Sequence, residues 1–184
     1  MLRRFLTTTA FCAAALTGGL LSVSPARAAL ETGSQAPDFS APASLGGHEF
    51  TYHLAQALKT GPVVLYFYPA AFTHGCTLEA HEFAEAIPQF KALGATVIGV
   101  SMDSIQKLDR FSVSECRSAF PVAADRDGKI TRAYAAKLPL LRMASRTSYV
   151  ISQSGRIVLA YASMSPDEHV TRALAAVRNL QAPH

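Results

Sequence analysis

Cysteine is scarce in this chain of 184 residues, where it occurs only as Cys12, Cys76 and Cys116. No two cysteines form the C-x-x-C pair that a disulfide oxidoreductase of the thioredoxin type uses, because Leu78 and Glu79 follow Cys76 without a second cysteine. The sequence therefore disfavours that class of enzyme. Internal repeats, low-complexity tracts and domain linkers are also absent from the sequence.

Long apolar runs are missing outside the first 28 residues. This leader has Arg3 and Arg4, an apolar stretch at 5–21 that threonines and glycines interrupt, and an A-x-A motif that ends at Ala28. The pattern predicts a secretory signal peptide rather than an anchor, because the stretch falls short of about 20 clean apolar residues. We expect cleavage near Ala28, loss of Cys12 with the leader, and a periplasmic location. Sec and twin-arginine export both stay open.

An excess of charge of one sign is absent once the leader is set aside. The whole chain has 17 Lys and Arg against 13 Asp and Glu, a formal charge of +4. Three arginines lie in the leader, so residues 29–184 have 14 basic against 13 acidic residues and a charge of +1. Such a domain gives no reason to expect nucleic acid or an anionic membrane surface as a partner. Its length suits one domain with a real core.

Strand and helix patterns alternate along the chain and predict an α/β fold. Two apolar, β-branched runs at 62–68 and 95–100 have the composition of strands buried on both faces, and helical periodicity follows each. The other expected elements are an extended lead-in (29–43), a hairpin turn at Gly46-Gly47, a short helix (53–60), long helices (73–93 and 104–118), a short strand and turn (120–128), a helix (128–137), a strand pair (147–152 and 156–163) and a C-terminal helix.

Local signals refine the helix ends and the sheet. Pro88 predicts a kink or break in the first long helix. Ser165 as N-cap, Pro166 at the first helical position and Glu168 completing a capping box predict where the last helix begins. The early elements suggest parallel crossovers, and the Ser154-Gly155 turn suggests antiparallel pairing. Together they predict one mixed sheet with helices on both faces.

Cys76 stands where the first buried strand gives way to the first long helix. A thiol reacts as its thiolate, and the unpaired N–H groups and dipole of a helix N-terminus stabilise such an anion. Gly75 allows close approach of the backbone, and the hydroxyl of Thr73 can donate to the sulfur or to a bound oxygen. Pro69 can shield the thiolate without adding a competing N–H. These residues predict a nucleophilic cysteine.

A positive charge would complete this anion-stabilising pocket. Arg146 is the best candidate, because it directly precedes the predicted strand 147–152. Strand ends line the functional clefts of α/β sheets.

These motifs carry a resemblance to a known family. Pro69, Thr73 and Cys76 spell P-x-x-x-T-x-x-C, and Thr77 with Glu79 completes C-T-x-E. On these residues the chain resembles the peroxiredoxins, and most of all the bacterioferritin-comigratory (Q-type) branch of the alkyl hydroperoxide reductase and thiol-specific antioxidant family. The further matching segments are Ala36-Pro37-Asp38-Phe39, Tyr66 to Pro69, Val97 to Ser101, Phe120-Pro121 with Asp125, and Arg146 to Ile151.

The resemblance implies a thioredoxin-like fold and an antioxidant thiol peroxidase that needs no metal, flavin or haem. Cys76 would be the peroxidatic cysteine, which reduces hydrogen peroxide or an organic hydroperoxide and becomes a sulfenic acid. Thr73 and Arg146 would position the peroxide, Pro69 would shield the thiolate, and Glu79 would orient the arginine. A thioredoxin-like protein or a small thiol would be the reductant, and the enzyme would be a monomer or a homodimer.

Two positions depart from the family pattern. His74 stands where many Q-type members have proline, and His81 stands where they have a resolving cysteine. Cys116 lies in the predicted helix 104–118 and is expected to face inward, about one turn beyond the usual place of a resolving cysteine in that helix. Either Cys116 or an external thiol therefore resolves the sulfenic acid.

A different class of function is also compatible with the cysteine and its neighbours. His74, Cys76 and His81 offer one soft ligand and two imidazoles, which would suit an exported copper-binding protein of thioredoxin-like fold. Such ligation does not explain Thr73, Pro69 or Arg146, so this reading is the weaker alternative.

Overall fold

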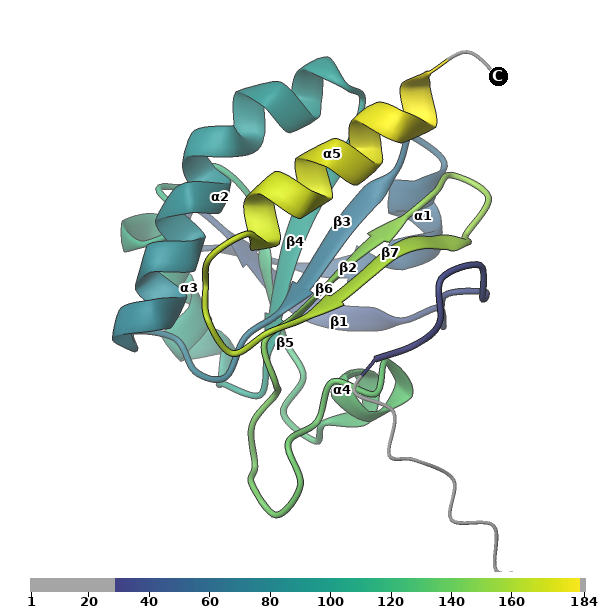
Figure 1. The fold of residues 1–184 in the computed structure, drawn as a ribbon. Coiled ribbons are helices and arrows are strands. Elements are labelled where there is room, and N and C mark those ends of the chain that lie inside the picture. Colours follow the sequence, from purple (N-terminus) through teal and green to yellow (C-terminus); the bar gives the residue numbers. More distant parts are fainter. Residues whose placement is uncertain (1–28, 183–184) are drawn as a thin grey trace, which may run out of the picture.

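The computed structural model describes residues 29–182, and the predicted signal peptide (1–28) lies outside the described residues. A seven-stranded sheet is flanked by five helices (Figure 1). The elements are β1 (Ser40–Leu45), β2 (His48–His53), α1 (Leu54–Leu58), β3 (Val63–Phe67), α2 (His74–Ala92), β4 (Thr96–Ser101), α3 (Ile105–Ser114), β5 (Val122–Ala124), α4 (Lys129–Ala133), β6 (Thr147–Ile151), β7 (Ile157–Ala162) and α5 (His169–Gln181).

The sheet is mixed, as the order of the elements predicts. Its strand order is β2-β1-β5-β4-β3-β6-β7, with β3, β4 and β5 parallel and the other neighbours antiparallel. Because β6 runs against β3, its first residue, Thr147, pairs with the last residue of β3, Phe67. The start of β6 therefore lies at the edge of the sheet where β3 ends and the chain turns toward α2.

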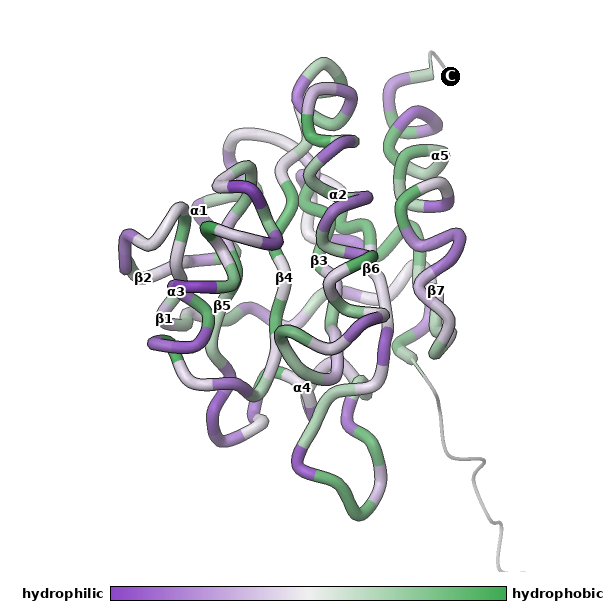
Figure 2. The backbone as a smooth tube through the Cα atoms, turned by 90° about the vertical axis from the view of Figure 1, so that its left-hand side faces the viewer, coloured by the Kyte–Doolittle hydropathy of each residue, from purple (hydrophilic) through white to green (hydrophobic). Residues whose placement is uncertain are grey.

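The central strand β3 is buried on both faces, which explains its continuous apolar sequence. Val64 and Tyr66 face a core shared with α2, α3 and α5, whereas Val63 and Leu65 face a core shared with α1 and α4. Figure 2 shows hydrophobic and hydrophilic residues alternating along α2 and α5, as expected for helices that cover one side of a sheet. Helices on both faces were predicted, and the structure confirms them.

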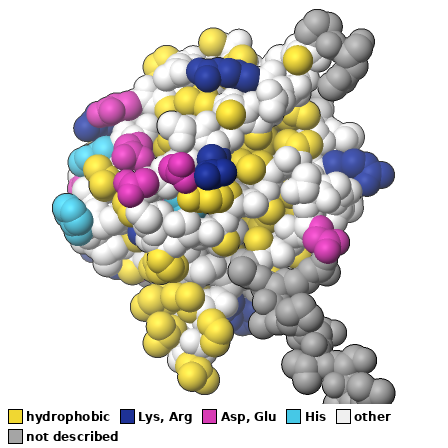
Figure 3. Space-filling view, in the orientation of Figure 1, with side chains coloured by type: hydrophobic (Ala, Val, Ile, Leu, Met, Phe, Trp, Pro, Cys, Tyr) yellow, Lys and Arg dark blue, Asp and Glu magenta, His cyan; other side chains and the backbone are white. Residues whose placement is uncertain are grey.

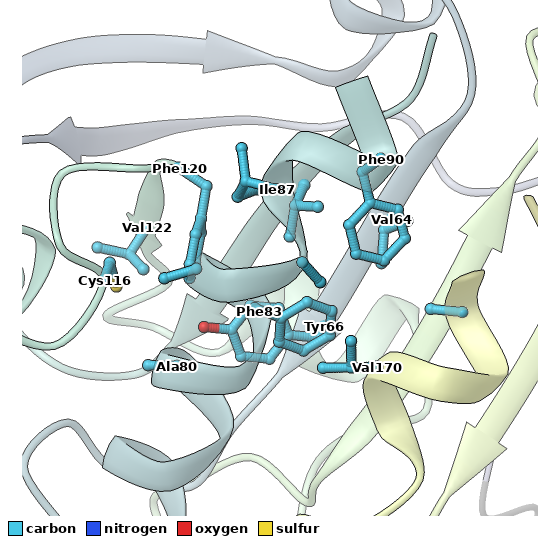
Figure 4. Close-up of a cluster of buried hydrophobic side chains, with 14 of the residues drawn as sticks. Val64, Tyr66, Ala80, Phe83, Ile87, Phe90, Cys116, Phe120, Val122 and Val170 are labelled. Carbon is cyan, nitrogen blue, oxygen red and sulfur yellow. The ribbon is translucent and has the colours of Figure 1, made fainter. Parts of the chain in front are cut away.

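Aromatic rings fill the core beneath α2 (Figure 4). Tyr66 stacks on Phe83 with ring centroids 4.3 Å apart, and Phe83 stacks on Phe90 at 6.2 Å. Cys116 lies at the side of this cluster near Phe120. The thiol thus contributes to the packing of the core.

The extended lead-in predicted for 29–43 runs into β1, which begins at Ser40 and pairs with both β2 and β5. The structure corrects two other predictions, the effect of Pro88 on α2 and the end of α3. Pro88 does not end α2, since it lies on the exposed side near the last turns and removes only one backbone donor. Helix α3 ends at Ser114, so Cys116 lies just beyond the helix rather than within it.

The start of the last helix was also predicted wrongly. Helix α5 begins at His169, and its N-cap position is Glu168 in the left-handed conformation (φ 66°), without a side-chain capping bond. The hydroxyl of Ser165 instead donates to the carboxylate of Asp167 at 2.7 Å. The local motif is overridden because His169, the first helical residue, is buried against the sheet.

One loop between α4 and β6 presents apolar side chains to solvent. Leu140 is fully exposed and Leu141 is about half exposed. A hydrophobic protrusion is visible at the bottom of Figure 3, where Figure 1 places this loop. Among the helices of residues 29–182, none is both long and apolar enough to cross a bilayer.

Candidate active site

Cys76 lies in the first turn of α2, as its position in the sequence predicts. The helix begins at His74, with Thr73 at the N-cap position in an extended conformation. The first turn closes when the N–H of Thr77 donates to the carbonyl of Thr73 at 2.9 Å. Backbone N–H groups in such a turn have no partner within the helix, so their dipoles favour an anion at this place. The Cys76 side chain is only 1% exposed, which strengthens their effect on a thiolate.

Arg146 reaches Cys76 from the opposite side of the site. Its Nη2 lies 3.6 Å from Cys76 Sγ, and its Nε donates to the carbonyl of Met164 at 3.1 Å. A Cβ atom on residue 75 would lie only 3.0 Å from Nη2 of Arg146. The guanidinium therefore fits here because Gly75 has no side chain. The structure thus brings together two predicted site residues that are 70 positions apart.

Glu79 holds the other side of the guanidinium. It lies one helical turn after Cys76, its side chain is fully buried, and its Oε2 accepts a bond from Nη1 of Arg146. Burial raises the pKa of Glu79 to about 8, against the opposing influence of Arg146. Within the described residues, its second oxygen, Oε1, accepts no hydrogen bond.

His169 completes this buried polar group, and the sequence analysis did not single it out. Its Nδ1 lies 3.7 Å from Glu79 Oε1 and 2.8 Å from the hydroxyl oxygen of Ser148. Its Nε2 lies 3.1 Å from the carbonyl oxygen of Ser163. Burial lowers the pKa of His169 to about 4. Nothing in the spacing of the histidines points to this one, because its role depends on how α5 packs on α2 and β6.

The loop between β3 and α2 carries the two other predicted residues. Pro69 is half-buried two residues after the end of β3, and the hydroxyl of Thr73 donates to the carbonyl of Ala70 at 3.0 Å. Asp103, which the sequence analysis also missed, holds this loop by accepting from the N–H of Ala71 at 2.7 Å. The roles of Pro69 and Thr73 toward a peroxide remain predictions.

Cys116 faces inward, as predicted, is fully buried and forms no disulfide within residues 29–182. Burial raises the pKa of its thiol. The two residues that follow, Arg117 and Ser118, both have left-handed backbones, with φ of 51° and 54°. Such conformations are strained for residues with a Cβ atom.

Two ion pairs hold the strained segment 115–118 against α2. His81 Nε2 lies 3.1 Å from Glu115, and Arg117 lies 3.1 Å from Glu85. His81, which occupies the position of a common resolving cysteine, thus contacts the residue that directly precedes Cys116.

Comparison with known proteins identifies the family. A profile of the AhpC/TSA family matches residues 32–160. Peroxiredoxin Bcp of Xanthomonas campestris is 32% identical over 149 residues, which are 78% of this chain and 91% of that protein. The crystal structure of peroxidoxin BcpB from Mycobacterium tuberculosis superposes with a TM-score of 0.76 at 32% identity, and the match covers 83% of this chain and 99% of that one. The chain belongs to the AhpC/TSA family. It is a peroxiredoxin, a thiol peroxidase of the oxidoreductase class, and its fold is thioredoxin-like as predicted.

The geometry of this peroxiredoxin gives no support to the copper-binding alternative. Among the described residues, no three or more His, Cys, Asp and Glu side chains are grouped so that they could hold a metal ion. His74 is exposed at the start of α2, and His81 pairs with Glu115 instead of approaching Cys76.

The raised pKa of Glu79 predicts how the peroxiredoxin responds to pH. Between the ordinary value of 4.5 and about 8, the folded state binds the proton more tightly than the unfolded state. Glu79 should therefore lower the free energy of unfolding as pH rises through this window, by up to about 1.4 kcal/mol per pH unit. The lowered pKa of His169 acts in the opposite direction between about 4 and 6.5, so the net loss should appear above pH 6.5. Glu79→Gln, which does not titrate in this range, should not show the loss. Urea unfolding of both proteins near pH 6.5 and pH 8 checks this prediction, with Glu85→Gln on the exposed side of α2 as the control. Parallel pH curves for wild type and Glu79→Gln would contradict the assignment.

Proposed function

We propose that Cys76 is the peroxidatic cysteine of an antioxidant enzyme that reduces hydrogen peroxide and organic hydroperoxides. The observation that carries this proposal is the approach of Arg146 Nη2 to Cys76 Sγ, 3.6 Å, in the buried first turn of α2. A permanent cation and a helix N-terminus that meet at one sulfur favour the thiolate, which is the reactive form. Similarity to peroxiredoxins supports the same assignment.

The proposed reaction begins with attack of the Cys76 thiolate on one peroxide oxygen. A sulfur–oxygen bond forms while the oxygen–oxygen bond breaks, and the departing oxygen leaves as water or an alcohol after it takes up a proton. Arg146 and the first backbone N–H groups of α2 stabilise the negative charge that grows on the oxygens. Thr73 would orient the peroxide by turning its hydroxyl from Ala70 toward the bound oxygen. Cys76 is left as a sulfenic acid.

We further propose that Cys116 resolves this sulfenic acid. Its thiol attacks Cys76, a disulfide forms and water leaves, and an external thiol then reduces the disulfide. Because Cys116 lies beyond α3, the strained segment 115–118 can leave α2 while α3 itself stays folded. A disulfide requires the two Cα atoms to come within about 7 Å, so this release precedes bond formation. The proposed reductant is a thioredoxin-like protein or a small thiol, and the proposed state is a monomer or a homodimer.

The site assignment predicts graded losses of peroxide consumption. Cys76→Ser should abolish turnover, because a hydroxyl does not ionise near neutral pH. Arg146→Lys should lower the rate about 10- to 100-fold, since a compact ammonium replaces the fork that contacts Sγ and Glu79 together. Stopped-flow consumption of hydrogen peroxide measures both effects, and Arg142→Lys in the exposed loop is the matched control. Full activity in Arg146→Lys would contradict the role given to Arg146.

The resolving step predicts the product of a single oxidation. One equivalent of hydrogen peroxide should yield an intramolecular Cys76–Cys116 disulfide, detectable by peptide mass spectrometry. In Cys116→Ser, dimedone should instead trap a lasting sulfenic acid on Cys76. A lasting sulfenic acid in the wild type would show that an external thiol resolves it.

We also propose that the protein is exported after cleavage near Ala28. N-terminal sequencing of the protein from fractionated cells should find a first residue at or near Ala29 in the periplasmic fraction. An intact leader in the cytoplasmic fraction would refute this proposal.

A further inference from the structure

A buried chain of four side chains extends from the reactive sulfur to α5. Cys76 contacts Arg146, Arg146 contacts Glu79, and Glu79 faces His169. Glu79 and His169 are both fully buried. Glu79 Oε1 accepts no hydrogen bond within residues 29–182, although an unpaired buried oxygen is costly. The atom that faces it is Nδ1 of His169, 3.7 Å away.

The contacts of His169 decide which of its nitrogens carries the proton. Nε2 faces the carbonyl oxygen of Ser163, which only accepts, so this nitrogen must be the donor. In the neutral ring, Nδ1 then has one lone pair, which both the hydroxyl of Ser148 and Glu79 Oε1 approach, so only one of these two groups donates to it at a time. A carboxylate oxygen and a nitrogen lone pair that face each other in a buried site repel. A proton on Oε1 removes the repulsion, because it turns Oε1 from an acceptor into a donor directed at Nδ1.

We propose that Glu79 and His169 share one proton. His169 is then a positioning residue: it keeps this proton on the pair, so that Glu79 does not neutralise Arg146 and the positive charge of Arg146 acts on Cys76. This inference rests on the proposed function of Cys76. With the proton in place, Arg146, Glu79 and His169 together carry a net charge of +1 beside the sulfur. Without it, Glu79 neutralises Arg146, and the site attracts the thiolate less.

The direction of the pKa values agrees with this arrangement. Burial raises the pKa of Glu79 to about 8 and lowers that of His169 to about 4, so the shared proton resides on Glu79 near neutral pH. The groups that face the pair are Cys76 and Glu82 on α2, Arg146 before β6, Tyr66 on β3, Tyr161 on β7 and Arg172 on α5. Tyr66 stays neutral because burial, with a smaller influence of Cys116, raises its pKa.

His169→Phe tests the pair because it keeps an aromatic ring against Tyr161 but removes the acceptor for the proton. Glu79 should then lose its proton at lower pH, and the thiolate fraction of Cys76 should fall. In a Cys116→Ser background, iodoacetamide should alkylate Cys76 about 3- to 10-fold more slowly near pH 7, where the wild type keeps the proton on Glu79 and the variant loses it, so that Glu79 neutralises Arg146. The two rates should converge near pH 9. His53→Phe, which disrupts the exposed contact of His53 with Ser40, is the matched control and should leave the rate unchanged.

A double-mutant cycle separates this role from a merely structural one. In Glu79→Gln the side chain at position 79 stays neutral, so adding His169→Phe should change the alkylation rate less than about twofold. An equal effect of His169→Phe in both backgrounds, or no effect in either, overturns the proposal. If His169→Phe does not fold, ¹⁵N NMR of His169 in the wild type decides. Its Nδ1 resonance should shift as Glu79 titrates and stay constant in Glu79→Gln, and a constant resonance in both overturns the pair.

Peroxide consumption provides the link to function. Its rate should follow the same pattern as alkylation across the four proteins of the cycle. The wild type could fail to consume peroxide while the alkylation rates still show that the effect of His169→Phe depends on Glu79. That result would support the shared proton and overturn the proposed function.

Discussion

The contact between Arg146 and Glu79 is the interaction on which the arrangement of the site depends. It ties the start of β6 to the first turns of α2, and it sets the guanidinium against Cys76 Sγ. Two features of the fold make it possible. The antiparallel pairing of β6 with β3 brings Arg146 to the edge where β3 ends, and the missing side chain of Gly75 leaves room for the guanidinium.

If Glu79 were ionised, its buried ion pair with Arg146 would be a poor source of stability. Removing two charges from water costs several kcal/mol each, and their attraction offsets this cost only when the remaining polar atoms are satisfied. Glu79 Oε1 does not meet that condition unless it shares a proton with His169. We therefore infer that Arg146, Glu79 and His169 serve mainly to fix a positive charge beside a reactive sulfur, and not to stabilise the fold.

The sequence predicted those parts of the site that local patterns determine. The apolar run of β3, the start of α2 and the position of Cys76 follow from composition and helix signals, and Arg146 follows from its place before a strand. His169 and Asp103 could not be predicted, because their partners lie 90 and 32 positions away on other elements. The end of α3 and the start of α5 were misjudged for a related reason: tertiary burial of Cys116 and His169 overrides local helix signals.

The two cysteines of the domain are buried for opposite purposes. Cys76 is enclosed by donors and a cation, which favour its charged form, whereas Cys116 is enclosed by apolar side chains, which favour its neutral form. A neutral thiol attacks poorly, so Cys116 becomes effective only when segment 115–118 opens to water. The left-handed backbones of Arg117 and Ser118 lower the cost of that opening, while the contacts of α2 with Glu115 and Arg117 oppose it.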